Sequence, residues 1–537
     1  MTALQASWAE KTLESMTLDE KIGQLFIVPA CPLRDDGHLA DIKNMITQYH
    51  IGGVILKQAD PEKQVTLINT LQNQSGLPLL CVMDAEWGLG MRMQNMISFP
   101  KNLTLGAIQN KEMLHTLGKE IGRQCKKVGG HVNLAPVVDV NSNPYNPIIH
   151  MRSFGESPDR VAECAVSLMQ GMQEAGILAC AKHFPGHGDT IVDSHVDLPV
   201  VSHSLERLER VEFYPFQKMI QAGVDSVMTG HLFVPSCESK QGCPATLSAK
   251  ITTDLLKNKL GFEGVVFTDA LNMKALTNHF STGEIALNAL RAGNDFLVYG
   301  DHIAPNIDRI LQIDVPEAIH GIKKAYEEGT ISKAELDGHV LKILKLKERL
   351  HLPENRETVA STNLLEDLNS ASARSLKKEL FRQAITLVRN KKNLLPLAEK
   401  NRKKIALVQM KDDGAFASLL KRDGDVNTFS FSKGAVLIRK LKHFSLVIFS
   451  VNAVSANQKD FGIPEEAEDL IQKLNYLRIP VILTIFGTPY ALSQFEVNPT
   501  VIMAYEDDID AYEAAADLIF GKLVPTGKLP VRYADGD

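Results

Sequence analysis

Short apolar runs recur between residues 25 and 299, and segments with a helical spacing of apolar positions separate them. Most runs are rich in β-branched or small residues and do not alternate with polar residues, as expected for strands buried on both faces of a parallel sheet. Eight strands are predicted: Leu25–Val28, Gly53–Leu56, Leu79–Met83, Val132–Val138, Leu178–Ala181, Ser226–Thr229, Val265–Phe267 and Phe296–Tyr299. Eight strand–helix units in roughly 340 residues predict a (β/α)8 TIM-like barrel.

A helix is predicted to begin after Thr17. Thr17-Leu-Asp-Glu20 has the form of a capping box, in which the Thr and Glu side chains each bond the other's backbone N–H group. Ile22, Leu25 and Phe26 follow at helical spacing.

A second α/β pattern follows the barrel. Residues 317–350 are charged and helical, and residues 353–375 are rich in Glu, Asn, Ser and Thr, as in a linker. Four further strands are predicted at Ile405–Met410, Leu446–Val451, Val481–Phe486 and Val501–Ala504, with helical patterns between them. We therefore expect an α/β fold with a catalytic barrel at 1–350, a linker at 351–375 and a smaller α/β sandwich domain with a parallel sheet at 376–537.

Polar residues follow the predicted barrel strands where each strand ends. They are Asp84 and Glu86 after the third strand, Arg152 beyond the fourth, Lys182 and His183 after the fifth, His231 after the sixth and Asp269 after the seventh. The carboxyl ends of barrel strands converge on one mouth, which is where barrel enzymes place their active sites. These side chains are therefore candidates for one site.

Composition narrows the class of protein. The 537 residues are too many for one core, and 44% hydrophobic with 23% charged residues is ordinary for a globular protein. A net charge of −6 gives no electrostatic reason to expect a nucleic acid or anionic membrane partner, and no apolar run is long enough to span a bilayer. The first residues lack the basic and apolar regions of a signal peptide.

Cysteine usage predicts free thiols. The seven cysteines include no CxxC pair and no Cys/His spacing that fits zinc. Free thiols indicate a reducing compartment, so we expect a cytoplasmic protein; a disulfide between Cys237 and Cys243 is the alternative.

The segment Ala181–His195 holds three histidines, two aspartates and a lysine. Pro185, Gly186 and Gly188 interrupt it, so a loop is predicted. A carboxylate two residues from a histidine on an extended loop can orient the imidazole and raise its basicity. Asp193 with His195 and His187 with Asp189 have the same spacing, so the residues alone do not choose between these two pairs.

Other candidates each have a structural alternative. Asp269 ends an apolar strand, where a catalytic carboxylate or a helix N-cap would use the same residue type. Asp84, Arg152, Lys182 and His183 could bind a hydroxylated ligand or form a buried ion-pair network. Trp87 could stack on a sugar or belong to the core.

Taken together, several motifs resemble glycoside hydrolase family 3. In the barrel they are Gly52–Leu56, Met83–Glu86, Asn133–Asn141, Arg152–Gly155, Lys182–Thr190, Asp193–His195, Pro244–Ser248 and Phe267–Met273, and in the second domain Ala384–Asn390, Asn393–Leu397 and Pro525–Pro530. The run Lys182-His-Phe-Pro-Gly-His-Gly-Asp-Thr190 followed by Asp193-Ser-His195 is similar to the β-N-acetylglucosaminidase branch.

The resemblance implies a retaining mechanism without a metal or organic cofactor. Asp269 would be the nucleophile, and His195, oriented by Asp193, the acid/base. Asp84, Arg152, Lys182, His183 and His231 would bind the terminal sugar. An imidazole titrates near neutrality and carries no negative charge in its base form, so a phosphate acceptor is not repelled.

The resemblance predicts an exo-acting β-N-acetylhexosaminidase whose partner is a small carbohydrate, as a monomer or homodimer. Peptidoglycan-derived fragments and chitooligosaccharides are both candidate substrates, because Ala85-Glu-Trp-Gly88 departs from the family's common form at this point. A GlcNAc phosphorylase, a β-glucosidase and a sugar-binding protein without activity are the alternatives.

Overall fold

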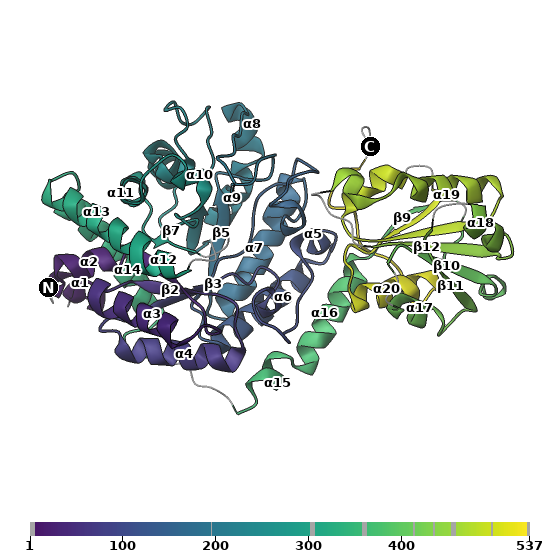
Figure 1. The fold of residues 1–537 in the computed structure, drawn as a ribbon, viewed down its shortest axis with the longest axis horizontal. Helices are drawn as coiled ribbons and strands as arrows, with labels where there is room; N and C mark the ends of the chain where they lie inside the picture. Colours follow the sequence, from purple (N-terminus) through teal and green to yellow (C-terminus); the bar gives the residue numbers. More distant parts are fainter. Residues whose placement is uncertain are drawn as a thin grey trace. The chain divides into compact units, whose positions relative to one another are not determined.

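The computed structural model describes residues 6–194, 196–300, 307–356, 362–391, 393–411, 414–432, 435–452, 458–495 and 498–533. His195, predicted as the acid/base, lies outside the described residues. The chain forms two compact units (Figure 1). The first comprises Met1–Phe99, Leu114–Val140 and Ala165–Ser370, and the second comprises Pro100–Met113, Asn141–Cys164 and Ala371–Asp537.

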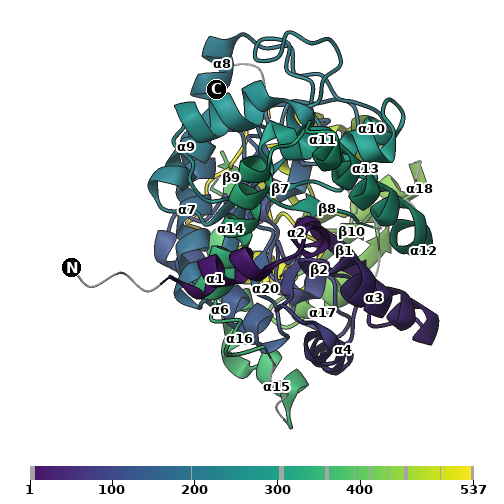
Figure 2. The same cartoon turned by 90° about the vertical axis from the view of Figure 1, so that its left-hand side faces the viewer.

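The first unit contains an eight-stranded parallel sheet in the order β7-β6-β5-β4-β3-β2-β1-β8. Its strands are β1 (Phe26–Ala30), β2 (Gly53–Leu56), β3 (Leu80–Met83), β4 (Val132–Asn133), β5 (Leu178–Phe184), β6 (Ser226–Thr229), β7 (Val265–Thr268) and β8 (Leu297–Val298). A bridge between Phe267 and Phe296 brings β7 beside β8, so the sheet nearly closes. The predicted TIM-like barrel is confirmed, and Figure 2 shows helices α3, α4 and α11 outside the strands.

Burial explains why the strands do not alternate in sequence. Every residue of β1, β2, β3, β6 and β7 is buried, so both faces of each strand need apolar side chains. The fourth strand is shorter than predicted and ends at Asn133, although the N–H groups of Leu134 and Val138 still donate to the carbonyls of Met83 and Lys182. The fifth strand is longer than predicted and includes Lys182 and His183, which the sequence pattern assigns to the loop.

The helices of the first 350 residues lie mostly between these strands. They are α1 (Trp8–Ser15), α2 (Leu18–Gly23), α3 (Asp36–Tyr49), α4 (Pro61–Gln74), α5 (Asn102–Leu105), α6 (Lys111–Lys127), α7 (Pro158–Glu174), α8 (Leu205–Arg210), α9 (Phe213–Gln221), α10 (Lys274–Thr277), α11 (Thr282–Ala292), α12 (Ile307–Arg309), α13 (Val315–Glu327) and α14 (Lys333–Arg349). Short 3-10 helices occupy Leu89–Met91, His150–Arg152 and Ala245–Leu247, and π-helical turns occupy Lys250–Lys259 and Ile310–Asp314. Among the described residues, none of the helices has the length and apolarity needed to cross a membrane.

The capping box at Thr17 is present as predicted. The Glu20 carboxylate accepts from the Thr17 N–H (2.8 Å), and the Thr17 hydroxyl accepts from the Glu20 N–H (3.3 Å). The predicted extension of this helix to Leu25 and Phe26 is wrong. Helix α2 ends at Gly23, and Phe26 is already the first residue of β1.

The second unit contains a six-stranded sheet in the order β11-β10-β12-β13-β14-β9, parallel except for β9. Its strands are β9 (Thr386–Asn390), β10 (Ile405–Gln409), β11 (Val426–Ser430), β12 (Leu446–Asn452), β13 (Val481–Phe486) and β14 (Thr500–Met503). Its helices include α17 (Ala415–Leu420), α18 (Ala435–Leu441), α19 (Glu465–Tyr476) and α20 (Ile509–Ile519), with 3-10 turns at Glu399–Asn401, Lys459–Gly462 and Pro489–Phe495. Phe416, Phe486 and Tyr512 meet edge to face or tilted in its core.

Helices α15 (Leu364–Leu368) and α16 (Ala371–Ala384) occupy part of the segment predicted as a linker, and α16 continues beyond it. Two segments of the first 164 residues, Pro100–Met113 and Asn141–Cys164, belong to the second unit. The boundaries at residues 350 and 376 stay a prediction.

Candidate active site

Five of the predicted site residues lie at the carboxyl ends of strands of the first unit, a region that we call the barrel mouth. Asp84 directly follows β3, Lys182 and His183 belong to the end of β5, and Asp269 directly follows β7. His231 lies two residues after β6. This is the position from which barrel enzymes act on their substrates.

Asp84 is held by two cations. Lys182 Nζ lies 3.0 Å from Asp84 Oδ1 and 2.9 Å from Glu86 Oε1, and Arg92 Nη2 donates to Asp84 Oδ2 at 2.7 Å. The Lys182 and Glu86 side chains are almost wholly buried, so each charge depends on this pairing. The ion-pair network is therefore confirmed for Asp84 and Lys182, with Glu86 and Arg92 as the further members in place of Arg152 and His183. It fixes a carboxylate that can also accept hydrogen bonds from hydroxyl groups.

Arg92 is a residue that sequence reasoning missed, because it lies in an irregular segment with no motif around it. Its backbone carbonyl accepts a hydrogen bond from the Ala59 N–H (3.2 Å), and Ala59 forms a bridge with Met93. The loop after β2 is therefore bonded to the segment that carries the partner of Asp84.

His183 and His187 share the carboxylate of Asp139. His183 Nδ1 lies 2.8 Å from Asp139 Oδ2, and the His187 N–H donates to Asp139 Oδ1 at 2.7 Å. Burial alone would raise the pKa of Asp139, but the two histidines lower it below its usual value. Asp139 was also missed as a site residue, although it lies in the run Asn133–Asn141.

A register shift in the pairing of β5 with β6 falls between Lys182 and Phe184, at His183. In a regular strand, Lys182 and His183 would point to opposite faces of the sheet. An irregularity of this kind re-aims a side chain. It accounts for two consecutive residues that both contact carboxylates of the barrel mouth.

His187 fixes the loop that continues to Asp193. The Thr190 hydroxyl donates to the carbonyl of His187 (3.1 Å) and therefore accepts from His187 Nδ1 (2.7 Å). His187 Nε2 is left to accept from the Ser194 hydroxyl at 3.1 Å. Burial lowers the pKa of His187 to about 4, against the opposing charges of Asp139 and Asp269, so the ring is neutral near pH 7.

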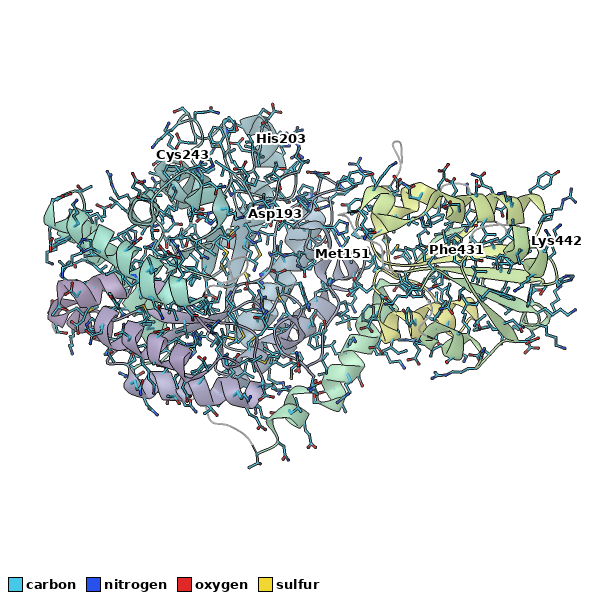
Figure 3. All side chains as sticks on the ribbon, in the orientation of Figure 1. Met151, Asp193, His203, Cys243, Phe431 and Lys442 are labelled. Atoms are coloured by element: carbon cyan, nitrogen blue, oxygen red, sulfur yellow. The ribbon has the colours of Figure 1, made fainter. Side chains whose placement is uncertain are left out.

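The structure separates the two candidate His–Asp pairs. Asp189 bonds His203 Nε2, while His187 bonds Thr190 and Ser194, so His187 and Asp189 do not act on each other as a dyad. Asp193 is described, on the segment after β5 (Figure 3), and its role with His195 stays a prediction.

The start of this loop is packed against the buried Glu212, which is paired with the partly exposed Arg207. The Glu212 carboxylate accepts two hydrogen bonds from Arg207 Nη1, at 2.9 and 2.8 Å, and burial raises the pKa of Glu212. A side chain at Gly186 would place its Cβ 2.8 Å from the Glu212 Cβ, and the φ of Gly186 is +130°. Only glycine fits this approach.

Asp269 is half-buried and does not cap a helix. The next helix, α10, begins at Lys274 with Met273 at its N-cap position. Asp269 Oδ1 accepts from the Ala270 N–H at 2.8 Å, and its own N–H donates to the Thr229 carbonyl at 2.9 Å. The helix-cap alternative is therefore wrong. The side chain is held at the barrel mouth by the hydrogen bond from the backbone N–H of the next residue, Ala270.

His231 supports the same turn. Its Nε2 donates to the Ala270 carbonyl at 2.9 Å, because a carbonyl can only accept, and Nδ1 lies 2.9 Å from the Thr246 hydroxyl. The ring is 1% exposed. Its contacts place it behind Asp269, and sugar binding by His231 stays a prediction.

Arg152 lies in the 3-10 turn His150–Arg152 of the second unit. Its backbone carbonyl accepts from Asn102 Nδ2 at 2.6 Å, and its Nη1 lies 3.5 Å from the Ile148 carbonyl. Its binding role stays a prediction.

Two family models match the chain. The glycosyl hydrolase family 3 N terminal domain matches residues 17–346, and the glycosyl hydrolase family 3 C-terminal domain matches residues 385–536. Beta-hexosaminidase A from Pseudoalteromonas piscicida is 33% identical over 382 residues, which are 67% of this chain and 62% of that protein, so the chain spans less than two thirds of this relative.

Two solved structures resemble the whole chain. A glycoside hydrolase family 3 β-N-acetylglucosaminidase from Paenibacillus sp. has a TM-score of 0.81 and 29% identity, covering 97% of this chain and 100% of that one. The beta-glucoside phosphorylase BglX, bound to 2FGlc, has a TM-score of 0.84 and 25% identity, covering 98% of this chain and 96% of that one.

Proposed function

Since the chain belongs to glycosyl hydrolase family 3, we propose that it is a retaining exo-β-N-acetylglucosaminidase that removes terminal β-linked GlcNAc. The observation that carries this proposal is the pairing of two elements at the barrel mouth. Asp269 directly follows β7, and the loop that leads to Asp193 directly follows β5, so both lie at the carboxyl ends of strands of one parallel sheet. A carboxylate and an adjacent proton-transfer loop are the two parts that retaining hydrolysis requires.

In the first step, the Asp269 carboxylate attacks the anomeric carbon while His195 donates a proton to the leaving oxygen. A covalent glycosyl ester forms, and the aglycone departs as a neutral alcohol. In the second step, the neutral imidazole takes a proton from water, which attacks the same carbon and releases Asp269. The configuration at the anomeric carbon is retained after two inversions.

The other residues bind and orient. Asp84, fixed by Lys182 and Arg92, is an anionic acceptor for sugar hydroxyls, and His183 is held in place by Asp139. Asp193 orients His195 and raises its basicity. Arg152 and His231 complete the set predicted from the family motifs.

The substrate class is a short GlcNAc-containing oligosaccharide, either a peptidoglycan-derived fragment or a chitooligosaccharide. The described cysteines, which include all seven of the chain, are free, which supports a reducing compartment and the predicted cytoplasmic location. The choice between a monomer and a homodimer stays a prediction.

Phosphorolysis is the second candidate. The similarity to BglX favours it, and a neutral imidazole base does not repel phosphate as a carboxylate base would. The same nucleophile and loop would serve, with phosphate replacing water in the second step.

Nitrophenol release from aryl β-GlcNAc and aryl β-glucoside, each with and without phosphate, tests the proposal. We expect fast turnover of the GlcNAc substrate that does not depend on phosphate. Turnover that requires phosphate and yields a sugar 1-phosphate would identify a phosphorylase instead. Selective turnover of the glucoside would identify a β-glucosidase, and inactivity on both would contradict an enzymatic role.

A further inference from the structure

The loop between β5 and α8 leaves the barrel mouth on one limb and returns to it on another. On the outgoing limb, the N–H of His187 donates to Asp139 at 2.7 Å. On the returning limb, Val200 forms a parallel bridge with Phe233, which follows β6. Both limbs are therefore bonded to the chain around the barrel mouth, and residues 190–197 between them form what we call the loop tip.

Burial of apolar side chains does not hold the loop tip. Its described apolar residues, Ile191, Val192 and Val196, are 80%, 37% and 62% exposed, so they contribute little hydrophobic stabilisation. The ion pair between Asp197 and His279 (3.6 Å) is exposed as well, and a pair of this kind contributes little. The position of the loop tip therefore depends on contacts made closer to the sheet.

One pair of side chains joins the two limbs below the loop tip. The carboxylate of Asp189, on the outgoing limb, bonds Nε2 of His203, on the returning limb. These side chains are 28% and 33% exposed, so water competes less with their contact than with the Asp197–His279 pair. A surface segment whose two ends meet in this way is an Ω-loop, and the Asp189–His203 pair closes it.

The returning limb is anchored directly after His203. The next residue, Ser204, is the N-cap of α8, and its hydroxyl accepts from the Arg207 N–H at 3.3 Å. Arg207 in turn donates to the Glu212 carboxylate, and Glu212 lies against Gly186 at the start of the outgoing limb. The backbone beside His203 is therefore fixed to the body of the first unit.

Asp189 is adjacent to the contacts that lead to Asp193. Its neighbour Thr190 accepts from His187 Nδ1 at 2.7 Å, and His187 Nε2 accepts from the Ser194 hydroxyl at 3.1 Å. A displacement of Asp189 would move Thr190 with it, because the two residues are consecutive. Since Asp193 directly precedes Ser194, the position of its carboxylate depends on where Asp189 is held.

We infer that His203 is a positioning residue for the acid/base loop, acting through Asp189. It fixes the outgoing limb relative to α8, and with it the dyad of Asp193 and His195 predicted on the loop tip. The inference rests on the proposed hydrolase function, because only a reaction step that takes a proton from the loop depends on the position of the loop.

A comparison of leaving groups tests this role in His203→Ala. The substrates are phenyl β-GlcNAc, whose leaving group depends strongly on a proton, and 4-nitrophenyl β-GlcNAc, whose leaving group depends on it much less. We expect kcat/KM to fall about tenfold or more for the phenyl substrate and less than about twofold for the other, because a misplaced proton donor loses part of the roughly 10²–10⁴-fold that acid–base catalysis contributes. Equal losses on both substrates, or no loss on either, would overturn the inference.

Two further variants separate positioning from proton transfer. His203→Gln retains an N–H group that can reach Asp189, so it is expected to recover most of the rate on the phenyl substrate. Because an amide cannot transfer a proton, this recovery would also exclude His203 as the acid/base itself. The double variant Asp189→Ala, His203→Ala is expected to be no slower than either single variant, since both changes remove one contact. Additive losses, or a Gln variant as slow as His203→Ala, would overturn the inference.

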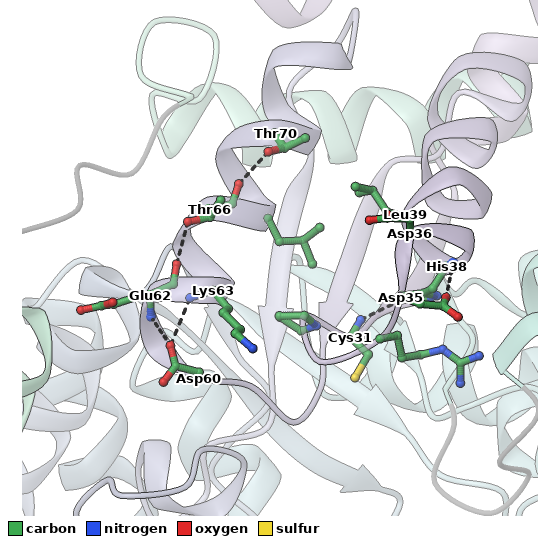
Figure 4. Close-up of a pocket in the computed structure, with 13 residues that line it drawn as sticks. Cys31, Asp35, Asp36, His38, Leu39, Asp60, Glu62, Lys63, Thr66 and Thr70 are labelled. Carbon is green, nitrogen blue, oxygen red and sulfur yellow. Dashed lines mark hydrogen bonds between the residues drawn. The ribbon is translucent and has the colours of Figure 1, made fainter.

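Hydrogen exchange supplies a readout that does not require turnover. In His203→Ala, the amides of the loop tip are expected to exchange faster than in the unmodified chain. Helix α4 (Figure 4), in which the N-cap Asp60 accepts from the N–H groups of Glu62 and Lys63, is the internal reference and is expected to be unchanged. Unaltered exchange at the loop tip would overturn the inference.

His279→Ala is the matched control, because it removes the other His–Asp contact of this loop. Its rate on the phenyl substrate is expected to stay within about twofold of the unmodified chain, as for loss of an exposed ion pair. A loss as large as that of His203→Ala would overturn the inference. Inactivity of the unmodified chain on every aryl glycoside would overturn the proposed function and this inference together, whereas an active chain unaffected by His203→Ala would overturn the inference alone.

Discussion

The ring of His187 accepts a hydrogen bond from the hydroxyl of Ser194, with 3.1 Å between Nε2 and Oγ. Ser194 directly follows Asp193, the carboxylate proposed to orient the acid/base. The backbone of His187 is itself bonded to Asp139. A chain of hydrogen bonds therefore leads from Asp139, after β4, through His187 to Ser194, and it fixes the loop next to Asp193.

Ser194→Ala removes this contact. One hydrogen bond contributes about 1 kcal/mol, so we expect kcat to fall up to about fivefold, with a smaller change in KM. Ser194→Thr, which retains the hydroxyl, is expected to recover most of the activity, and Ser202→Ala on the exposed loop nearby serves as the control. Identical pH–rate profiles for Ser194→Ala and the unmodified enzyme would mean that the contact does not position the dyad.

Asp269→Ala removes the proposed nucleophile. We expect turnover of aryl β-GlcNAc to fall by on the order of 10⁴-fold or more, as for loss of other enzymatic nucleophiles, with the melting temperature retained. Asp254→Ala, at an exposed aspartate of the same unit, is the control and is expected to remain active. Substantial activity in Asp269→Ala would assign the nucleophile to another residue.

Asp193→Ala tests the dyad through pH dependence. A neighbouring carboxylate raises the pKa of an imidazole, so its removal is expected to move the alkaline limb of the kcat/KM profile to lower pH by about one unit. His195→Ala is expected to slow substrates with poor leaving groups more than activated aryl ones, because only the former need a proton donor. An unmoved profile in Asp193→Ala would exclude it from the dyad.

Asp84→Asn tests sugar binding. A hydrogen bond to a charged acceptor contributes about 1.5–3 kcal/mol, so KM and the inhibition constant of GlcNAc are expected to rise by about one to two orders of magnitude. The remaining cations, Lys182 and Arg92, would also lose their counter-charge, so the melting temperature is measured in parallel. A loss of stability with unaltered GlcNAc affinity would indicate a purely structural carboxylate.

The half-buried His131 makes the free energy of unfolding depend on pH. Burial lowers its pKa from 6.5 to about 4, and its Nδ1 accepts from the Cys81 N–H at 2.9 Å. Between these values the unfolded chain binds more protons than the folded one, so stability is full above pH 6.5 and is lost as pH falls toward 4. At pH 5 the loss from this residue is about 2 kcal/mol.

Denaturant unfolding at pH 7 and pH 5 measures this contribution. His131→Gln can still accept from the Cys81 N–H but cannot titrate, so its stability is expected to fall less between the two pH values. His320→Gln, at an exposed histidine of α13, is the control and is expected to behave as the unmodified chain. The same pH dependence in His131→Gln would contradict the assignment.

The family and the barrel could be predicted because short motifs and short apolar runs, each contained in a few consecutive residues, indicate them. Strands β2 and β6 match their predicted ranges, since a strand buried on both faces leaves a continuous apolar run in the sequence. Strands β9 and β11 were not predicted. Both lie at the edges of the second sheet, and β11 is largely exposed, so its sequence Val-Asn-Thr-Phe-Ser has no apolar run.

The candidate site was predictable in position but not in connectivity. Asp84, Lys182 and Asp269 could be predicted because each follows a predicted strand, and the carboxyl ends of the parallel strands of a barrel lie on one face. Spacing could not distinguish the two His–Asp pairs, because the partner of Asp189 is His203, which comes fourteen residues later. Arg92 was missed because it lies in an irregular segment without a motif, so nothing in the sequence indicated its contact with Asp84.

The hydrogen bond from Ala59 to the carbonyl of Arg92 joins two places on the first unit. Ala59 lies beside Asp60, the N-cap of α4, and Arg92 holds Asp84. Coupling between two such places is reciprocal: if a ligand bound beside α4 changes the affinity for a sugar by some factor, the sugar changes the affinity for that ligand by the same factor. One titration, in whichever direction is easier, therefore measures both effects.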